Sequence, residues 1–288
     1  MRITAGGCSV ADSQFSLLMA VYAGDTSEFF ERAFKSSVQD QTLKPSEVIV
    51  VQDGPVSTEL AATLRTIKSA SPVPTSVIEL PANGGLAAAL ERGLAACQFD
   101  IVARMDADDI SLPHRFSNQL KAIDAGLDLV GAGMLEFADE DGVVLGRRVP
   151  PTGHEHIAHY ARFHDPFNHP TVVYRRSAVR KAGGYQDVGR MEDYWLFARM
   201  IQAGVRVDNL QEPLLMYRVG AGAYARRGGW SQLRAEVGLQ REFRRVGFTT
   251  RRQWLRNVLV RGGYRLVPVA LRKVAYRRFF TREGSHDL

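Results

Sequence analysis

Asp100-Ile-Val-Ala-Arg-Met-Asp-Ala-Asp-Asp109 is an apolar run that ends in three carboxylates within four residues. Asp100–Arg104 predicts a buried strand, and Met105–Asp109 predicts the loop at its carboxyl end. Crowded carboxylates at such a position raise one another's pKa unless a cation neutralises them. Their oxygen atoms suit Mg²⁺ or Mn²⁺, which one or two carboxylates hold together with substrate phosphates. The alternative is a solvated acidic loop before the helix that follows Pro113.

The same alternation of strand and helix extends toward the amino terminus. Three further apolar runs predict strands at Ser16–Val21, Glu47–Val51 and Ser76–Leu80. Helical patterns lie between them, from about Ser27, from Ser57 to Ser69 and from Leu86 to Ala96. Near-continuous apolar strands separated by helices indicate an α/β fold with a mostly parallel sheet that is covered on both faces.

The pattern loosens toward the carboxyl terminus. A helix through Phe116 is predicted to lead into a hairpin of Leu127–Phe137 and Val143–Val149, with Asp139–Gly142 as its turn. The later elements are a strand at Thr171–Tyr174, a helix at Glu192–Ala203 and two short extended pieces at Val205–Asn209 and Leu214–Arg218.

Composition sets broad limits on the class of protein. The 288 residues are 45% hydrophobic and 24% charged, which is typical of globular domains. Two cysteines, Cys8 and Cys97, provide neither a disulfide framework nor a cysteine-based zinc site and fit a reducing compartment. We find no secretory signal and no apolar run long enough to span a membrane.

Charge is concentrated at the carboxyl-terminal end. Of 37 basic residues, 12 lie between Phe243 and Arg282, where there is no Asp or Glu, so the rest of the chain is mildly acidic. Such a segment needs an anionic partner or ample solvent.

Other polar segments have ordinary structural explanations when each is taken alone. Asp53 before Gly54 could simply form a turn. Glu192-Asp193 is an acidic pair of the kind that favours a helix amino terminus. A lone histidine such as His169 is more often structural than catalytic.

Five segments taken together are more specific. They are Ser16–Tyr22, Val50–Gly54, Asn83–Ala87, Ala103–Asp109 and Met191–Trp195. Their order and spacing resemble those of family 2 glycosyltransferases with the GT-A fold, particularly the amylovoran and capsule-biosynthesis type. The resemblance covers about Phe15 to Arg218. It implies an amino-terminal extension at 1–14, a catalytic domain at 15–222 with a nucleotide-binding half (15–112) and an acceptor-binding half (113–222), and a basic amphipathic helical tail at 223–288.

The resemblance also implies roles for individual residues. Asp106 and Asp108 form a DxD motif that holds Mn²⁺ or Mg²⁺ with the donor diphosphate, and Asp193 is the catalytic base. The nucleotide sugar is expected to contact Ala20, Val21, Tyr22, Asp53, Asn83, Arg104, Asp106 and Ala107. The acceptor is expected to contact Glu192, His169 and Trp195. The sequence departs from the family at Gln52, where a second Asp is frequent, and at Pro55, which replaces a frequent Ser.

The implied reaction is a single, inverting, non-processive transfer. The donor would be a UDP-, dTDP- or GDP-linked sugar, and the acceptor a glycan or a polyprenyl-diphosphate-linked saccharide. A nucleotidyltransferase is the first alternative, but Met19–Asp25 lacks the glycine-rich phosphate loop with basic residues that such an enzyme should have. A catalytically inactive homologue that binds carbohydrate or lipid is the second, and the intact Asp106, Asp108 and Asp193 argue against it.

Two interpretations of the basic tail stay open. Its apolar residues and arginines could form two short amphipathic segments on an anionic membrane surface, which suits a lipid-linked acceptor. It could instead form a helical subdomain that packs on the acidic catalytic body. No nucleic-acid motif accompanies the charge, so no nucleic-acid partner is expected. The expected location is the cytoplasm, peripheral to the inner face of the cell membrane.

Overall fold

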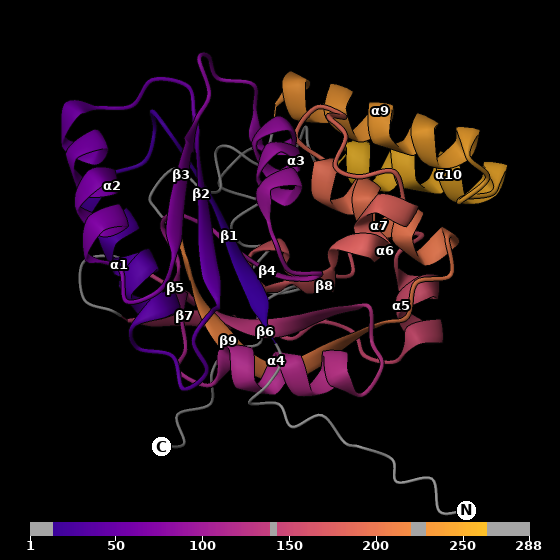
Figure 1. The fold of residues 1–288 in the computed structure, drawn as a ribbon. Coiled ribbons are helices and arrows are strands. Elements are labelled where there is room, and N and C mark those ends of the chain that lie inside the picture. Colours follow the sequence, from indigo (N-terminus) through magenta and orange to yellow (C-terminus); the bar gives the residue numbers. More distant parts are fainter. Residues whose placement is uncertain (1–13, 139–142, 220–228, 264–288) are drawn as a thin grey trace, which may run out of the picture.

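Four parallel strands form the first part of the sheet in the computed structural model, which describes residues 14–138, 143–219 and 229–263 (Figure 1). These strands are β1 (Phe15–Tyr22), β2 (Glu47–Asp53), β3 (Thr75–Glu79) and β4 (Ile101–Met105), in the order β3-β2-β1-β4. The helices between them are α1 (Ser27–Val38), α2 (Thr58–Ala70) and α3 (Leu86–Ala96). Thr26 and Ser57 cap α1 and α2 through their hydroxyl groups, so both helices begin where the sequence predicts.

The second part of the sheet is mixed. Its strands are β5 (Ile110–Ser111), β6 (Leu129–Phe137), β7 (Val144–Arg148), β8 (Val173–Arg175) and β9 (Val207–Arg218). β8 runs antiparallel to β4 and β6, and β6 runs parallel to β9. β6 and β7 form the predicted hairpin, whose turn at 139–142 is outside the described residues. The remaining elements before the tail are α4 (Arg115–Asp124), α5 (His154–Tyr160), the 3₁₀ turn η2 (His169–Thr171), α6 (Arg176–Lys181) and α7 (Glu192–Gln202).

Two sequence-based expectations need correction here. The pieces at Val205–Asn209 and Leu214–Arg218 are parts of one strand, β9, because its pairing with β6 shifts register around Gly133 and continues beyond Pro213. A Cβ on Gly133 would lie 2.6 Å from the carbonyl oxygen of Gln211, so the irregularity depends on this close approach. Thr171 belongs to the 3₁₀ turn η2, and the strand begins at Val173.

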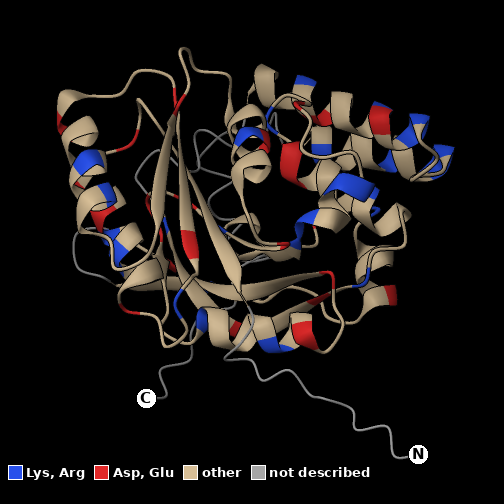
Figure 2. Cartoon of the chain, in the orientation of Figure 1, with Lys and Arg blue, Asp and Glu red and all other residues tan. Residues whose placement is uncertain are grey.

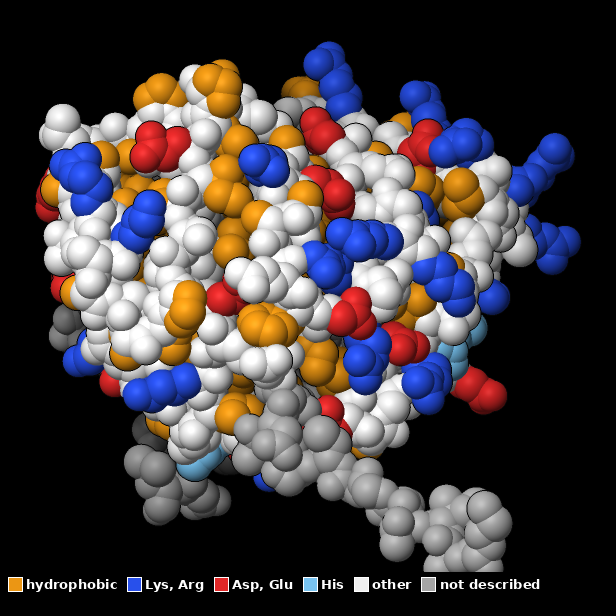
Figure 3. Space-filling model, in the orientation of Figure 1, with side chains coloured by type: hydrophobic (Ala, Val, Ile, Leu, Met, Phe, Trp, Pro, Cys, Tyr) orange, Lys and Arg blue, Asp and Glu red, His pale blue; other side chains and the backbone are white. Residues whose placement is uncertain are grey.

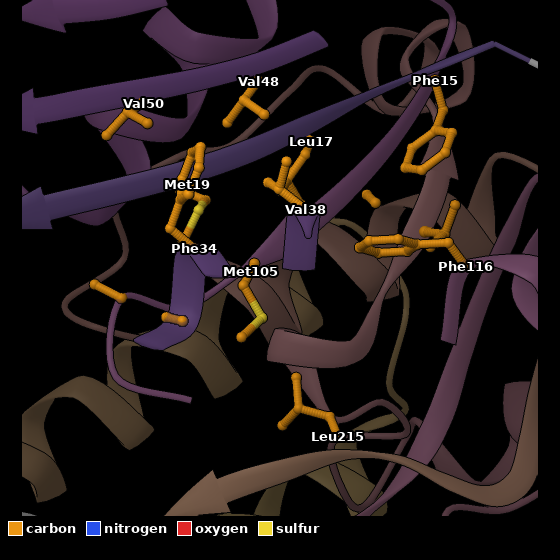
Figure 4. Close-up of a cluster of buried hydrophobic side chains, with 14 of the residues drawn as sticks. Phe15, Leu17, Met19, Phe34, Val38, Val48, Val50, Met105, Phe116 and Leu215 are labelled. Atoms are coloured by element: carbon orange, nitrogen blue, oxygen red, sulfur yellow. The ribbon is translucent and has the colours of Figure 1, made fainter. Parts of the chain in front are cut away.

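The sheet separates two hydrophobic cores because successive side chains of β1 point to opposite faces. Leu17 and Met19 pack against α1, α2 and α4, whereas Leu18 packs against α3 and α7. Figure 4 shows the first core, where Phe15 of β1 lies 5.0 Å from Phe116 of α4 between ring centres. The three-layer arrangement that the sequence predicts is therefore present.

The described part of the tail packs on α7. It consists of α9 (Trp230–Arg245), α10 (Arg251–Asn257) and the π-helical turn η3 (Val258–Gly262). Phe243 of α9 is fully buried against Tyr194 and Trp195 in a third hydrophobic cluster. Within the described ranges, none of the helices combines the length and apolar character needed to cross a bilayer.

Polar contacts also attach the tail to the body. Arg261 forms an ion pair with the fully buried Glu236 at 2.6 Å and donates to the carbonyl oxygen of Phe163 at 2.9 Å. Asn257 donates to the carbonyl oxygen of Arg162 at 2.8 Å. At least one of the twelve basic residues between Phe243 and Arg282 is thus committed to an internal contact. Arginines that point outward are concentrated on α9 and α10 (Figures 2 and 3).

Candidate active site

The predicted site residues of the amino-terminal half meet at one edge of the sheet, where the carboxyl ends of β1, β2 and β4 lie together. Tyr22 at the end of β1 is in register with Asp53 at the end of β2, and Met19 of β1 is in register with Met105 of β4. Ala20 and Val21 belong to the last residues of β1, and Asp106 follows β4 directly. This edge is where ligands bind in open α/β sheets.

Asp53 holds the adjoining loop in place. Its two carboxylate oxygens accept hydrogen bonds from the backbone N–H groups of Gly84 at 2.7 Å and Gly85 at 2.9 Å, and its side chain is buried. The amide of Asn83 donates to the carbonyl oxygen of Asp53 at 3.2 Å. Gly54 has a φ of +82°, and a Cβ there would lie 2.5 Å from the backbone nitrogen of Asn83. Asp53 and Asn83 are therefore neighbours, and their contact with a nucleotide stays a prediction.

Arg104 and Asp106 form a bidentate ion pair. Nη1 of Arg104 donates to Oδ2 of Asp106 at 2.7 Å, and Nη2 donates to Oδ1. The Arg104 side chain is 2% exposed, whereas that of Asp106 is 30% exposed. Burial opposes the charge of Arg104, and the carboxylate of Asp106 compensates by raising the pKa of Arg104. Ala107, the next predicted contact, is buried.

Arg218 is a site residue that sequence reasoning missed. Its backbone N–H donates to Oδ1 of the fully buried Asp109 at 2.9 Å, and its Nε donates to the carbonyl oxygen of Asp108 at 2.6 Å. Its guanidinium lies 3.9 Å from the ring centre of Phe29 and 4.7 Å from that of Phe137. Asp109 and Arg218 thus fix the loop that presents Asp108. The sequence signal for Arg218 was its place at the end of Leu214–Arg218, a segment that also resembles the family.

Asp25 is a second residue that was missed. Its Oδ2 accepts the backbone N–H of Tyr22 at 2.9 Å. Burial raises the pKa of Asp25 to about 7, with the charges of Asp108 and Asp106 adding to the effect and the Tyr22 hydrogen bond opposing it. Burial and the charge of Asp106 likewise raise the pKa of Asp108 to about 6. The three carboxylates of Asp25, Asp106 and Asp108 therefore act on one another in one region of the site.

The donor set of this region fits a divalent cation that a ligand helps to bind. Among the described residues, no group of three or more His, Cys, Asp or Glu side chains is arranged to hold a metal ion on its own. Asp106 and Asp108 supply carboxylate oxygens, and their mutual repulsion is the kind that a cation relieves. Phosphate oxygens of a substrate would have to complete the coordination, as is usual for Mg²⁺.

Asp193 and His169 face each other at the amino terminus of α7. Oδ1 of Asp193 accepts the backbone N–H of Tyr194 at 2.7 Å, and Oδ2 lies 3.9 Å from Nδ1 of His169. Burial raises the pKa of Asp193, while the hydrogen bond from Tyr194 and the charge of Arg104 oppose that effect. Arg104 therefore forms an ion pair with Asp106 and also lowers the pKa of Asp193, so its charge links the two halves of the site.

The other two predicted acceptor contacts differ in exposure. Glu192 is half-buried, and burial followed by the charge of Asp193 raises its pKa to about 7. Trp195 is 2% exposed, stacks near Phe243 and donates its Nε1–H to Gln186 at 2.9 Å. Because its ring fills the core between α7 and α9, Trp195 does not present a surface to an acceptor.

Comparisons of sequence identify the family. A family model described as glycosyl transferase family 2 matches residues 16–183. The amylovoran biosynthesis glycosyltransferase AmsE of Erwinia amylovora is 36% identical over 269 residues, which cover 92% of this chain and 98% of AmsE. The UDP-Gal:alpha-D-GlcNAc-diphosphoundecaprenol beta-1,3-galactosyltransferase of Escherichia coli is 30% identical over 274 residues, which cover 93% of this chain and 97% of that protein.

Comparisons of structure show the fold. The mannosyltransferase PcManGT from Pyrobaculum calidifontis, solved with GDP-Man and Mn²⁺, matches with a TM-score of 0.63 at 16% identity, over 96% of this chain and 77% of that one. S. aureus TarS 1–349, solved with UDP-GlcNAc, matches with a TM-score of 0.62 at 14% identity, over 93% of this chain and 74% of that one. The architecture is therefore the GT-A fold that the sequence predicts.

Proposed function

This chain is a family 2 glycosyltransferase, and from that premise we propose that it transfers one sugar at a time from a nucleoside-diphosphate sugar to a hydroxyl group of a glycan or lipid-linked saccharide, with inversion at the anomeric carbon. The product would be part of a cell-surface polysaccharide or glycolipid. The observation that carries the proposal is the position of Asp193: its carboxylate lies 3.9 Å from Nδ1 of His169, and the charges of Arg104 and Asp106 both act on it.

Two groups of residues bind and orient the donor in this proposal. Asp53 and Asn83 shape the pocket for the base or ribose beside the end of β1, where Tyr22 is half exposed. Asp106 and Asp108 hold the diphosphate end through Mn²⁺ or Mg²⁺, a cation that offsets negative charge on the departing diphosphate. Arg218 keeps the Asp108 backbone in place.

Asp193 acts as the general base. Its carboxylate takes the proton from the acceptor hydroxyl as that oxygen forms the new bond to the anomeric carbon and the bond to the diphosphate breaks. The partial exposure of Asp193, 29%, leaves room for an acceptor to reach it. A single displacement of this kind needs no second carboxylate as a nucleophile.

Relatives narrow the substrates to be tried. The name of the Escherichia coli relative gives UDP-Gal as donor and GlcNAc-diphosphoundecaprenol as acceptor. The name of AmsE places that relative in amylovoran biosynthesis. The solved neighbours were bound to GDP-Man and UDP-GlcNAc. We therefore propose a UDP-, dTDP- or GDP-linked donor and an acceptor with a polyprenyl diphosphate.

A peripheral position at the inner face of the cell membrane belongs to the same proposal. α9 and α10 border a shallow hollow of about 510 Å³ lined by Arg241, Arg244, Arg245, Arg251, Trp254 and Leu255. Leu255, Leu259 and Val260 are more than half exposed on the adjoining turns. We call this surface the basic face. Its mixture of arginines and exposed apolar side chains supports contact with an anionic bilayer.

A donor screen tests the proposal. Purified protein is incubated with UDP-, dTDP- and GDP-sugars and Mn²⁺, with and without a GlcNAc-diphospho-alkyl acceptor, and the nucleotide released is identified. We expect a nucleoside diphosphate from one donor class, loss of its release in EDTA and a sharp decrease in Asp193→Asn. Formation of a nucleoside triphosphate and a sugar 1-phosphate when pyrophosphate is added would instead indicate a nucleotidyltransferase.

A further inference from the structure

His169 and Tyr185 form a buried polar pair directly behind Asp193. Nε2 of His169 lies 2.9 Å from the hydroxyl oxygen of Tyr185, while Nδ1 on the other side of the ring lies 3.9 Å from Oδ2 of Asp193. His169 is 8% exposed and Tyr185 is 5% exposed. The imidazole also packs edge-on against Phe197, with ring centres 5.9 Å apart. The ring is thus held between a phenol and a carboxylate.

The surroundings determine which nitrogen carries the proton. Burial and the charge of Arg104 hold the pKa of His169 well below 6.5, so the ring is neutral and has one N–H donor and one acceptor nitrogen. Burial raises the pKa of Tyr185, so its hydroxyl keeps its single proton, for which the hydroxyl of Tyr174 and Nε2 of His169 are the neighbouring acceptors. If the Tyr185 hydroxyl donates to Nε2, the proton of the ring is on Nδ1 and points toward Asp193. The other tautomer would direct a lone pair at a carboxylate.

Several elements hold this pair rigidly. Tyr185 follows two glycines with positive φ angles, 85° at Gly183 and 70° at Gly184, and its backbone N–H donates to Glu91 of α3. Arg199 of α7 donates to the carbonyl oxygen of Gly184 at 2.6 Å. On the other side, Arg115 of α4 donates to the carbonyl oxygen of Pro170 at 2.9 Å. A pair fixed from three helices is suited to orienting a third group.

From this geometry we propose that His169 is a positioning residue for Asp193: Tyr185 fixes the imidazole as the Nδ1–H tautomer, and Nδ1–H orients the Asp193 carboxylate by a hydrogen bond. The separation of 3.9 Å closes to hydrogen-bond length when an acceptor occupies the site, since catalytic hydrogen bonds are often long in unliganded enzymes. His169 keeps its proton throughout. This role rests on the proposed function, in which Asp193 receives the acceptor proton.

The hydrogen bond also keeps the base ionised. A donor aimed at a carboxylate favours the charged form and lowers its pKa, against the burial that raises it. The charged and titratable groups that face Asp193 or act on its charge come from several elements: Arg104 and Asp106 from β4 and its loop, Asp165 and His169 from the segment before β8, Tyr185 from the glycine turn, and Glu192 from α7. Among these groups, only Arg104 carries a positive charge. A hydrogen bond from the neutral ring of His169 is therefore a second interaction that favours the ionised form of Asp193, and it adds no positive charge.

The tautomer can be observed without any substrate. A long-range ¹H–¹⁵N correlation spectrum of the metal-free full-length protein, labelled in its seven histidines, assigns His169 by the signal that is lost in His169→Asn. We expect a neutral ring protonated on Nδ1 at pH 7, and a mixture of tautomers in Tyr185→Phe. A ring protonated on Nε2, or on both nitrogens, in the wild-type protein would overturn the proposal.

Matched variants separate positioning from packing. Asn places an amide N–H where Nδ1 stood, Gln places it where Nε2 stood, and Phe retains only the ring. Carbon-13 titration of Asp193 in the presence of GlcNAc-diphospho-alkyl should give a pKa near the wild-type value in His169→Asn and a value about half a unit or more higher in His169→Gln and His169→Phe. Equal values in all three variants would show that the ring serves packing alone. His156→Asn, on the exposed side of α5, is the control.

Turnover distinguishes this inference from the proposed function. With the donor and acceptor from the screen, beginning with UDP-galactose and GlcNAc-diphospho-alkyl, kcat should decrease about tenfold or more in His169→Gln while the donor KM changes less than twofold. His169→Asn should recover much of that loss. If Asp193→Asn retains full activity, the proposed base is wrong. If Asp193→Asn is inactive and His169→Gln turns over like the wild type, only the positioning role is wrong.

Discussion

Arg104 and Asp106 are two residues apart in the sequence and bind each other through both guanidinium nitrogens and both carboxylate oxygens, with the longer contact at 2.7 Å. Both carboxylate oxygens of Asp106 therefore accept hydrogen bonds from Arg104 in this structure. Asp108 has no such partner among the described residues, and its pKa is raised to about 6 by burial and by Asp106. Asp106 and Asp108 are therefore not equivalent, and we predict that Asp108 is the one that meets a cation.

Asp108→Ala should remove the metal-dependent part of nucleotide binding and leave the fold intact. The reason is that the substitution removes the carboxylate that is free to bind a cation but keeps the Asp109–Arg218 contact that fixes the loop. Calorimetry of UDP, dTDP and GDP with and without Mn²⁺ measures the effect. Asp40→Ala, at an exposed position after α1, is the control. An unchanged Mn²⁺-dependent affinity in Asp108→Ala would contradict the assignment.

Asp193→Asn should keep donor affinity within a few-fold and lose about 10² to 10⁴ in transfer rate, the usual effect of removing a positioned base. Glu192→Gln should be milder. Consecutive helical residues point about 100° apart, so only one of the two can aim at the acceptor. Initial-rate assays with the donor from the screen decide the matter. A near wild-type rate in Asp193→Asn with an inactive Glu192→Gln would reverse the two roles.

Asp25→Asn should stabilise the metal-free protein increasingly as pH rises from about 4 to about 7. Burial raises the pKa of Asp25 from 3.8 to about 7, so the folded state holds the proton more tightly than the unfolded chain does. The stability linked to this proton is complete below the unfolded pKa and is lost as pH rises through the folded value. Urea unfolding of both proteins at pH 5 and pH 8 gives the comparison. A difference in unfolding free energy that does not grow with pH would show that Asp25 ionises freely.

Replacing the four arginines of the basic face by Gln, at Arg241, Arg244, Arg245 and Arg251, should weaken binding to anionic vesicles strongly, since each basic residue contributes on the order of 1 kcal/mol. Added salt should weaken binding of the wild-type protein in the same way. Substitution is cleaner than deletion from Arg251 onward, because deletion also removes Arg261 from the buried Glu236. Four exposed basic residues elsewhere, Arg65, Lys68, Lys121 and Lys181, provide a charge-matched control. Equal sedimentation of the wild-type protein, the basic-face variant and the control variant with the vesicles would rule out the basic face as the membrane-binding surface.

The first half of the fold could be predicted because its signals are local. The continuous apolar run at Glu47–Val51 and the capping hydroxyl of Ser57 each specify an element without reference to distant residues. β9 could not be read as one strand, since its continuity past Pro213 depends on pairing with β6. Long-range pairing is invisible in a pattern of single residues.

The candidate site divides in the same way. Asp106 and Asp108 stand out because three acidic residues lie within four positions, whereas Asp193 was singled out through the resemblance to family 2 glycosyltransferases. Asp25 and Arg218 do not, because their significance arises only when β1 and β9 end beside the loop after β4. Trp195 was misjudged for a related reason: its position beside Asp193 in sequence does not reveal that α9 covers its ring.

The shared cluster of α7 and α9 has a practical consequence for protein engineering. Tyr194, next to the proposed base, packs its ring against Phe243 of the tail, with ring centres 4.9 Å apart. A chimera that takes its tail from a relative would also need that relative's α7 residues that contact α9. A fragment that ends before α9 would expose the same α7 side chains to water. A portable catalytic unit therefore has to include α9 together with α7, and exchange of acceptor preference between relatives has to be planned around that contact.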